Sequence, residues 1–355
     1  MRTLVLGGTE FVGRAVAEEA LGRGWEVTVF NRGTRPAPAG AAGLRGDRSA
    51  PRGLAALGDG AWDLVVDTWT GAPSAVRDMA RLLAGRVPQY TYISSRSVYR
   101  MPAPAGLTEE GPTVEASPDA GASDYAANKR GGELAAEREY GDRALFVRAG
   151  LIIGPHDNVG RLPWWLSRIA RGGPVLAPGP RELPLQVIDA RDLARWALDA
   201  SARGLGGPYD MVSPSGFTTT GELLDTCAEV TGSQAALHWA PPEVVTGAGI
   251  EPWTEMPLWM PPGEMHDTIH RSDVSKVLAA GLRCRPVRDS VADTWTWMRT
   301  EGGMEPRVHD AMPGRPGVPP EKEAAALRAL ESRPGGQRNT AQGTGRVPGT
   351  ARPDS

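Results

Sequence analysis

Apolar and polar positions along the first thirty residues predict a strand, a turn, a helix and a second strand. Residues 2–6 form a short apolar run, and a glycine-containing segment follows at 7–13. Residues 14–22 have the apolar spacing of a helix, and residues 25–30 form a second apolar run. This order predicts a βαβ unit whose glycines lie at the first strand-to-helix turn.

The same pattern continues through the next seventy residues. Strands are predicted just before Gly46, at 62–67 and at 89–94, with a helix at 75–84. Each strand ends in a cluster of polar residues, and open parallel sheets bind ligands beyond the carboxyl ends of their strands. The predicted fold class is α/β: a Rossmann-like, doubly wound parallel sheet with a smaller C-terminal α/β substrate domain and a disordered tail.

Two features of the βαβ unit predict a bound dinucleotide. Glycines at 7, 8 and 13 allow the backbone to approach a pyrophosphate, and the following helix N-terminus favours its negative charge. The second strand ends in Asn31 and Arg32, where an acidic residue would bind the ribose hydroxyls of NAD. Because a guanidinium pairs bidentately with a phosphate, we expect NADP to be preferred over NAD.

A second candidate site consists of Tyr125 and Lys129. The chain has three lysines, at 129, 276 and 322, among 39 basic residues, and one of them follows a tyrosine by four residues. On a helix these two side chains share a face, so the ammonium lies beside the phenol. A nearby cation lowers the pKa of a tyrosine towards neutrality, which suits an acid–base group acting on an alcohol or carbonyl.

The second half of the chain predicts a smaller domain. We expect a helix at 162–170 to cover the cleft, a strand at 185–188 to return to the larger domain, and a helix at 190–201 to pack on it. A strand follows at 208–212, and Thr220 begins a helix with an acidic first turn. The predicted NAD(P)-binding domain spans 1–157 with 185–212 returning to it. The substrate domain spans 158–184 and 213–301, and the tail spans 302–355, mostly disordered apart from a helix at 320–331.

Composition narrows the class of protein. The net charge of −3 gives no electrostatic reason to expect nucleic acid or a membrane as partner, and no apolar run reaches the roughly 18 residues of a membrane span. Two cysteines, Cys227 and Cys284, fit a reducing cytoplasm, and a chain that starts in a strand leaves no room for a signal peptide. The preference for Arg over Lys, with abundant Ala, Gly and Pro, suggests a bacterial source.

Several motifs together resemble the short-chain dehydrogenase/reductase superfamily, in its extended, epimerase-like branch. They lie in the family's order at 7–13, 67, 94–99, 125–129, 147–155 and 188–194. The resemblance implies a catalytic set of Ser95, Tyr125 and Lys129. In that scheme Tyr125 transfers the proton, Ser95 hydrogen-bonds the substrate oxygen, and Lys129 holds the nicotinamide ribose. It also implies a homodimer formed through two helices of the larger domain.

The sequence departs from the family's pattern at three places. Glu10 stands where the family has its middle glycine, and a carboxylate near phosphate is unfavourable unless it points away. Arg96 and Ser97 follow Ser95, where dehydratases of the branch carry Asp and Glu, so the groups for water elimination are missing. Leu185 occupies the position of an Arg that often reaches the substrate diphosphate in nucleotide-sugar enzymes.

The leading hypothesis is therefore an NAD(P)-dependent oxidoreductase, a carbonyl reductase or alcohol dehydrogenase, acting on a small molecule by hydride transfer. An NAD-dependent sugar or sugar-nucleotide epimerase is the alternative, because it uses the same three catalytic residues. A non-catalytic RNA-binding or sensor protein on the same fold is the alternative from another class, supported by Glu10 and by a resemblance to stem-loop RNA-binding proteins. The candidate cofactor-binding residues are Gly7, Gly8, Thr9, Glu10, Phe11, Val12, Gly13, Asn31, Arg32, Asp47, Arg48, Thr68 and Trp69.

Some side chains leave two interpretations open. The proline-bounded segment with Trp253 and Trp259 is either a lid over an apolar substrate or ordinary packing of a long loop. His266 and His270 have a spacing that can bind a metal on a helix, but no third ligand is evident, so no metal site is predicted. We expect Glu109, in a loop at 101–122, to be solvated.

Overall fold

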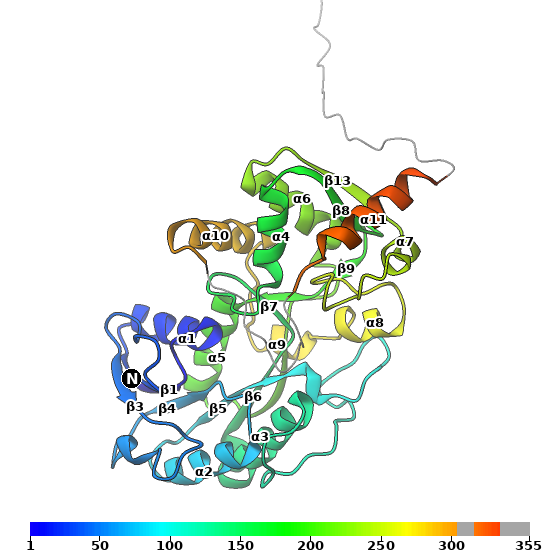
Figure 1. Cartoon of the computed structure of the whole chain (residues 1–355). Coiled ribbons are helices and arrows are strands. Elements are labelled where there is room, and N and C mark those ends of the chain that lie inside the picture. The colour runs from blue at the N-terminus through cyan, green and yellow to red at the C-terminus, as the bar shows by residue number, and fades with distance from the viewer. Residues whose placement is uncertain (304–315, 334–355) are drawn as a thin grey trace, which may run out of the picture.

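The larger part of the molecule is built on one seven-stranded parallel sheet (Figure 1). The computed structural model describes residues 1–303 and 316–333. The strand order is β11-β6-β5-β4-β1-β2-β3, and every neighbouring pair is parallel. The strands are β1 (Arg2–Leu6), β2 (Glu26–Asn31), β3 (Ala42–Arg45), β4 (Leu64–Asp67), β5 (Tyr90–Ser95), β6 (Ala144–Ala149) and β11 (Gly207–Met211).

Helices cover both faces of this sheet. The first two are α1 (Phe11–Gly22) and α5 (Ala190–Ala202), which share one apolar core on one face. The other two are α2 (Pro73–Leu83) and α3 (Tyr125–Tyr140), which enclose a second core on the opposite face. Every residue of β4, β5 and β6 is buried, as expected for strands covered on both sides.

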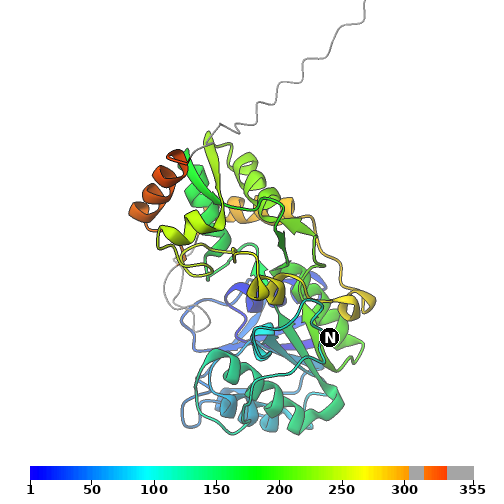
Figure 2. The ribbon, with the colours of Figure 1, turned by 90° about the vertical axis from the view of Figure 1, so that its right-hand side faces the viewer.

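The smaller part packs above the carboxyl edge of the sheet, as Figure 2 shows from the side. A parallel pair of strands, β8 and β13, lies at its centre, and helices surround the pair around a separate apolar core. Its elements are α4 (Arg161–Ala170), β8 (Gly173–Pro178), β9 (Pro184–Leu185), β12 (Thr218–Thr219), α6 (Thr220–Thr231), β13 (Ala235–Ala240), α7 (Pro242–Gly247), α10 (Val287–Thr300) and α11 (Pro320–Glu331).

Several short elements connect the two parts. The expected strand at 185–188 is divided into β9, which pairs with β12, and β10 (Val187–Asp189), which pairs with β7 (Leu151–Ile153). Gln186 lies between them, and its backbone N–H donates to Nδ1 of His270 instead of to a neighbouring strand. The chain later forms two short helices, α8 (Glu264–His270) and α9 (Ser275–Ala279). It returns to the larger part there, because Val274, Val277 and Leu282 lie in the core of that part.

The α/β fold class, with its parallel sheet and smaller C-terminal part, is confirmed. The first helix begins at Phe11, three residues before its predicted start, because Glu10 already accepts the first helical hydrogen bond from Arg14. The helix predicted at 320–331 is α11, whereas the rest of the predicted disordered tail lies mostly outside the described residues. Within the described ranges, no helix combines the length and apolar character that crossing a bilayer requires.

Candidate active site

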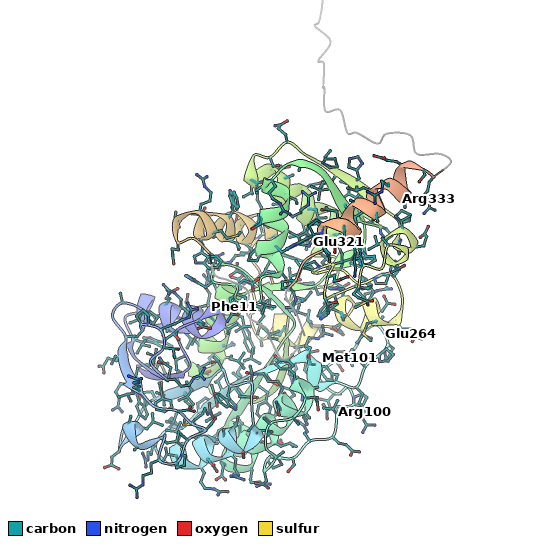
Figure 3. All side chains as sticks on the ribbon, in the orientation of Figure 1. Phe11, Arg100, Met101, Glu264, Glu321 and Arg333 are labelled. Atoms are coloured by element: carbon teal, nitrogen blue, oxygen red, sulfur yellow. The ribbon has the colours of Figure 1, made fainter. Side chains whose placement is uncertain are left out.

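A cleft of about 850 Å³ lies between the two parts, at the carboxyl edge of the sheet. Its walls include the turn after β1, the ends of β2, β4 and β5, the start of α3, and residues of the smaller part. Phe11 and Met101, both lining the cleft, lie at the level of the junction between the parts (Figure 3). The cleft therefore lies where the sequence predicts a binding site, beyond the carboxyl ends of the strands.

The turn between β1 and α1 brings backbone close to backbone. Gly7 and Gly8 have φ of 114° and 79°, values that side chains rarely tolerate. A Cβ on Gly13 would lie 2.6 Å from the backbone nitrogen of Gly8, so the helix can pack this closely only without a side chain there. The turn therefore leaves the start of α1 facing the cleft, which is a geometry that fits a dinucleotide pyrophosphate.

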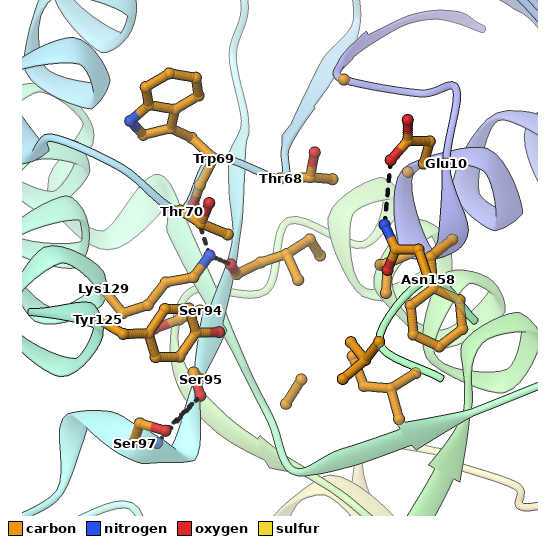
Figure 4. Close-up of a pocket in the computed structure, with 18 of the residues that line it drawn as sticks. Glu10, Thr68, Trp69, Thr70, Ser94, Ser95, Ser97, Tyr125, Lys129 and Asn158 are labelled. Atoms are coloured by element: carbon orange, nitrogen blue, oxygen red, sulfur yellow. Dashed lines mark hydrogen bonds between the residues drawn. The ribbon is translucent and has the colours of Figure 1, made fainter. Parts of the chain in front are cut away.

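Glu10 also lies at this turn, and its carboxylate is paired. Oε1 lies 2.6 Å from Nε of Arg35, and Oε2 accepts a hydrogen bond of 3.1 Å from the side-chain amide of Asn158 (Figure 4). Asn158 comes from the loop before α4, so this contact joins the glycine turn to the beginning of the smaller part. Pairing with Arg35 offsets the negative charge that Glu10 brings to the phosphate region.

The polar ends of β2 and β3 lie along the same wall. Asn31 accepts a hydrogen bond of 2.6 Å from the backbone of Gly33, whereas the side chain of Arg32 is exposed at the rim of the cleft. Asp47 accepts a hydrogen bond from the backbone of Ser49. Asn31, Arg32 and Asp47 all line the cleft, so the structure brings these sequence-predicted residues together.

Arg48 has a structural partner. Its guanidinium donates two hydrogen bonds, of 2.7 and 2.9 Å, to the buried carboxylate of Asp67, and it lies over the ring of Trp69. Asp67 also accepts a hydrogen bond of 2.5 Å from Tyr90. The charge of Arg48 is therefore paired within the protein. Its guanidinium packs on the ring of Trp69, and both residues line the cleft.

Tyr125 and Lys129 lie one turn apart at the start of α3, on the wall opposite Glu10 (Figure 4). Asp124 caps the helix by accepting a hydrogen bond of 3.0 Å from the backbone of Ala127. The Nζ of Lys129 is 6.0 Å from the ring centroid of Tyr125. A Cβ on Gly132 would collide with the ring of Tyr92, so this glycine allows α3 to approach β5 closely.

The ammonium of Lys129 is almost completely buried. It donates hydrogen bonds of 2.6 Å to the backbone carbonyls of Trp69 and Ile93, at the ends of two neighbouring strands. Burial lowers the pKa of Lys129 from its ordinary value to about 7, while Asp67 and Glu133 act in the opposite direction. The lysine therefore titrates near neutral pH, with its nitrogen held at the floor of the cleft.

Ser95 ends β5 beside these residues. Its Oγ accepts a hydrogen bond of 3.1 Å from the backbone of Ser97 and lies 3.2 Å from the hydroxyl of Ser97. Ser95, Tyr125 and Lys129 all line the cleft, which places three residues from two distant segments along one wall. A hydroxyl, a phenol and an amine in this arrangement can exchange a proton with an alcohol or carbonyl.

A buried polar network lies behind the wall that contains Ser95, Tyr125 and Lys129. Glu133, on α3, accepts hydrogen bonds from Ser94 and from both Nε and Nη2 of Arg148. Arg96 points away from the reaction wall, donating to the carbonyls of Thr268 and Ile269 and lying 3.5 Å from Asp210. The network ties α3, β5 and β6 together and connects them to α8 of the opposite side.

Burial distinguishes several side chains that the sequence singles out. Glu109 is buried rather than solvated, because its carboxylate accepts a hydrogen bond of 2.9 Å from the backbone of Asp210. His266 and His270 are buried with their rings 5.0 Å apart, and within 1–303 and 316–333 no group of three metal-binding side chains forms. Trp259 is buried in the core of the smaller part, whereas Trp253 lines the cleft.

Arg161, the first residue of α4, is a cleft residue that sequence reasoning missed. It is 9% exposed, and its Cζ lies 5.2 Å from the ring centroid of Trp253. The available signal was a basic residue at the start of a largely apolar helix, at 161–170. Such a position is typical of many surface helices, so the pattern by itself does not single it out.

Comparisons with known proteins agree with this geometry. Residues 63–209 match the model of the NAD dependent epimerase/dehydratase family. No curated protein matches the chain. Many solved structures match the chain.

One is UDP-glucose 4-epimerase from Thermus thermophilus in complex with NAD, which is 22% identical with a TM-score of 0.60. Another is UDP-glucuronic acid 4-epimerase from Bacillus cereus in complex with NAD, which is 14% identical with a TM-score of 0.61. The third is WbmG from Bordetella bronchiseptica in complex with NAD and UDP, which is 18% identical with a TM-score of 0.63. The alignments cover 84%, 85% and 85% of this chain and 99%, 98% and 96% of those chains.

At these identities the solved structures establish the fold, and the family model matches the segment that contains Ser95, Tyr125 and Lys129. The segment at 63–209 is therefore similar to the NAD dependent epimerase/dehydratase family, and the chain shares its fold with the three solved enzymes.

Proposed function

We propose that the protein is an NAD-dependent epimerase that inverts a secondary alcohol carbon of a sugar or sugar derivative. The observation that carries this proposal is the shared wall of Ser95, Tyr125 and Lys129, in one cleft with the glycine turn. The similar solved structures named as 4-epimerases support it. These observations favour the epimerase, which was the alternative hypothesis from the sequence. The leading hypothesis from the sequence, a reductase with an exchangeable cofactor, becomes the second candidate.

In this proposal the two walls of the cleft have different tasks. The glycine turn and the start of α1 hold the dinucleotide pyrophosphate, and the ends of β2 and β3 hold its adenosine half. When bound, NAD supplies the chemistry of taking up a hydride and returning it. Returning it to the opposite face of the same carbon inverts that carbon, so the net reaction consumes no cofactor.

The proposed catalytic residues handle the proton. Tyr125 takes the proton of the substrate hydroxyl as a ketone forms, and gives it back when the alcohol is restored. Ser95 hydrogen-bonds the same substrate oxygen and keeps it within reach of Tyr125. Lys129 donates two of its three N–H bonds to backbone carbonyls, so its position is fixed while the third can serve a ligand.

Dehydration of the substrate is disfavoured by the same geometry. Water elimination needs an additional acid and base beside the catalytic hydroxyl, and the two residues after Ser95 are Arg96 and Ser97. The guanidinium of Arg96 is directed towards Asp210 and the carbonyls near α8. Epimerisation requires neither group, because Tyr125 serves both directions.

Replacing Tyr125 by Phe tests the catalytic assignment. The first sugar derivative tried is UDP-glucose, with further sugars if it is inert, and the epimer formed is detected by NMR. On any sugar that turns over, Tyr125→Phe should lower kcat by about 10²–10⁴-fold, because the proton-transfer group is lost. Tyr209→Phe, at a tyrosine outside the cleft lining, should keep wild-type turnover. A wild-type rate in Tyr125→Phe would disprove the assigned chemistry.

The nucleotide content of the purified protein separates epimerase from reductase. An epimerase keeps its cofactor through the cycle, so denaturing the protein should release NAD in a near-stoichiometric amount. An empty site that binds added NADPH would instead identify an exchangeable-cofactor reductase. Failure to bind either nucleotide would favour the non-catalytic interpretation.

The reductase remains the second candidate because of one observation, the exposed side chain of Arg32 at the rim beside Asn31. If Arg32 pairs with a 2′-phosphate, Arg32→Ala should weaken NADPH binding about tenfold or more while leaving NADH binding nearly unchanged. Titration with both nucleotides measures the ratio of the two dissociation constants. An unchanged ratio would rule out NADP preference through this residue.

A further inference from the structure

Arg161 is a buried cation whose local contacts do not account for its charge. It is 9% exposed, and its Nε has no hydrogen-bond partner among the described residues. Its side chain nevertheless lines the cleft. Burying a guanidinium without partners is strongly unfavourable, so a group that enters the cleft and accepts its hydrogen bonds would remove this penalty.

The other arginines of the cleft lining are accounted for by their positions and contacts. Arg48 is paired with Asp67, and Arg96 lies 3.5 Å from Asp210. Arg32 is exposed at the rim, directly after β2, where the adenosine half of the dinucleotide is expected. None of these three guanidinium groups is therefore available to the substrate end of the cleft.

The remaining charged residues of the lining do not neutralise Arg161 either. Burial lowers the pKa of Lys129 to about 7, and its ammonium is directed to backbone carbonyls. The acidic residues in the lining are Glu10 and Asp47, and both belong to the turns expected to hold the dinucleotide. Among residues 1–303 and 316–333, Arg161 is therefore the positive charge at the substrate end of the cleft.

Asp157 lies four residues before Arg161, in the loop that precedes α4, and is the nearest acidic group in sequence. Its Oδ1 accepts hydrogen bonds of 2.9 and 3.0 Å from the backbones of Val159 and Gly160, whereas its Oδ2 has no hydrogen-bond partner among the described residues. Burial raises the pKa of Asp157 from its ordinary value. The aspartate thus shapes the turn that begins α4 and offsets only part of the cation's burial.

Trp253 holds the guanidinium in place on one face. The two groups are stacked at 5.2 Å, and the backbone of Trp253 is fixed by a hydrogen bond of 3.0 Å to the carbonyl of Trp259. Trp253 adopts a φ of 70°, an unusual conformation for a bulky residue and one that clusters at ligand sites. A guanidinium stacked in this way keeps its planar edge for bidentate pairing with an anion.

The surroundings indicate what else the ligand contains. Met260, Met265 and Ile269 line the cleft from the smaller part together with Trp253. Burial lowers the pKa of Arg161, and the charges of Asp157 and Tyr125 oppose that effect, so the guanidinium and the phenol lie within electrostatic range. An anion on Arg161 would therefore lie in the same cleft as the carbon that reacts at Tyr125, with an apolar portion beside it.

We propose that Arg161, stacked on Trp253, anchors a carboxylate or phosphate group of the substrate next to an apolar part of the same molecule. This inference rests on the proposed function for the identity of the reacting site. It narrows the substrate to an acidic alcohol or its ketone, in which the anion and the reacting carbon occupy the same cleft. A neutral sugar would leave the buried guanidinium without a partner.

Binding of small probes tests this proposal without knowledge of the substrate. Benzoate, phenyl phosphate and the neutral analogue benzamide are titrated into the full chain, with and without NAD, by calorimetry. The wild type should bind one of the two anions at least about tenfold more tightly than benzamide, because the bond to Arg161 is charge-assisted. The tighter anion identifies carboxylate or phosphate as the anchored group.

Substitutions test whether the preference for an anion over benzamide depends on Arg161. Arg161→Met should abolish the preference for the anion, and Arg161→Lys should keep part of it. The matched control is Arg171→Met, at an exposed arginine just after the same helix, which should behave as wild type. If Arg161→Met does not fold, Trp253→Leu carries the test, because losing the stack should weaken anion binding several-fold.

Two results would overturn the proposal. One is the absence of anion binding, or of any preference over benzamide, in the wild type. The other is an unchanged preference in a folded Arg161→Met protein. In titrations without NAD, the difference between wild type and Arg161→Met isolates the contribution of Arg161. A protein that fails to bind NAD would therefore reject the proposed epimerase while leaving the anion result interpretable.

Discussion

At the scale of single residues, the cleft depends on side chains whose burial changes their chemistry. Lys129 is the clearest example, since a four-residue spacing from Tyr125 predicts a shared helix face and the structure places both residues in the first turns of α3. The groups that contact the Lys129 ammonium, in contrast, cannot be predicted from this spacing. The two carbonyls that hold its Nζ belong to Trp69 and Ile93, which lie 60 and 36 residues away in sequence.

A pH-dependent contribution to stability should follow from the burial of Lys129. Its pKa is lowered to about 7 in the folded protein, whereas the unfolded chain has the ordinary value of 10.5. Between these values the unfolded state binds more protons, so the stability should rise with pH, by up to about 1.4 kcal/mol per pH unit. The destabilisation is complete below pH 7 and disappears above 10.5.

Urea unfolding of wild type and Lys129→Met at several pH values from about 6 to about 10 measures this effect. The free energy of unfolding of the wild type, relative to that of the variant, should increase across the window from neutral pH upwards. A difference that stays constant with pH would mean that Lys129 remains protonated in the folded protein.

At the scale of elements, the starts of three helices line the proposed active site. The strand-to-helix turn before α1, the first turn of α3 and the first residue of α4 all face the same cleft. Glu10 is the N-cap residue of α1, and it is clamped between Arg35 and Asn158. A glycine at this place would offer the pyrophosphate more room, so the carboxylate is expected to limit cofactor affinity.

Replacing Glu10 by Gln should tighten NAD binding severalfold. The change removes one negative charge from the phosphate region and allows Arg35 to interact with the pyrophosphate. Titration by tryptophan fluorescence measures the dissociation constant of NAD. The difference in NAD affinity between Glu10→Gln and wild type should decrease as salt is added. Glu18→Gln, at an exposed position of the same helix, is the matched control. Weaker binding in Glu10→Gln would show that the carboxylate itself helps to hold the cofactor.

At the scale of the whole molecule, two apolar cores on the sheet and one in the smaller part enclose the cleft between them. The smaller part is completed by α11, which packs on β8 through a buried contact. Glu323 accepts hydrogen bonds of 2.9 and 2.8 Å from Nε of Arg168 and one of 3.2 Å from the backbone of Leu176. A segment late in the chain therefore belongs to the core structure.

Glu323→Ala should destabilise the protein by roughly 3–5 kcal/mol, because it leaves Arg168 buried without its carboxylate. The affinity for NAD should remain near that of wild type, since the dinucleotide turn lies in the larger part. Thermal unfolding and NAD titration of the same samples give both quantities. Glu331→Ala, exposed on the same helix, should change neither. An equal loss of NAD affinity would show that the two parts are coupled through α11.

The sequence by itself determined the sheet, the glycine turn and the Tyr125–Lys129 pair, because each depends on contacts that are local along the chain. Strands buried on both faces read as apolar runs, and a helix face repeats every three to four residues. The helix at 320–331 was predicted for the same reason.

Only the tertiary structure decided which charges are paired and which face the cleft. The burial of Glu109 beneath Asp210, the clamp on Glu10 and the position of Arg161 in the cleft wall all depend on segments that meet from distant parts of the chain. A side chain's charge is visible in the sequence, but its partner and its solvent exposure are properties of packing. The wall with Tyr125 and Lys129 could therefore be predicted from spacing, whereas the substrate end of the cleft could not.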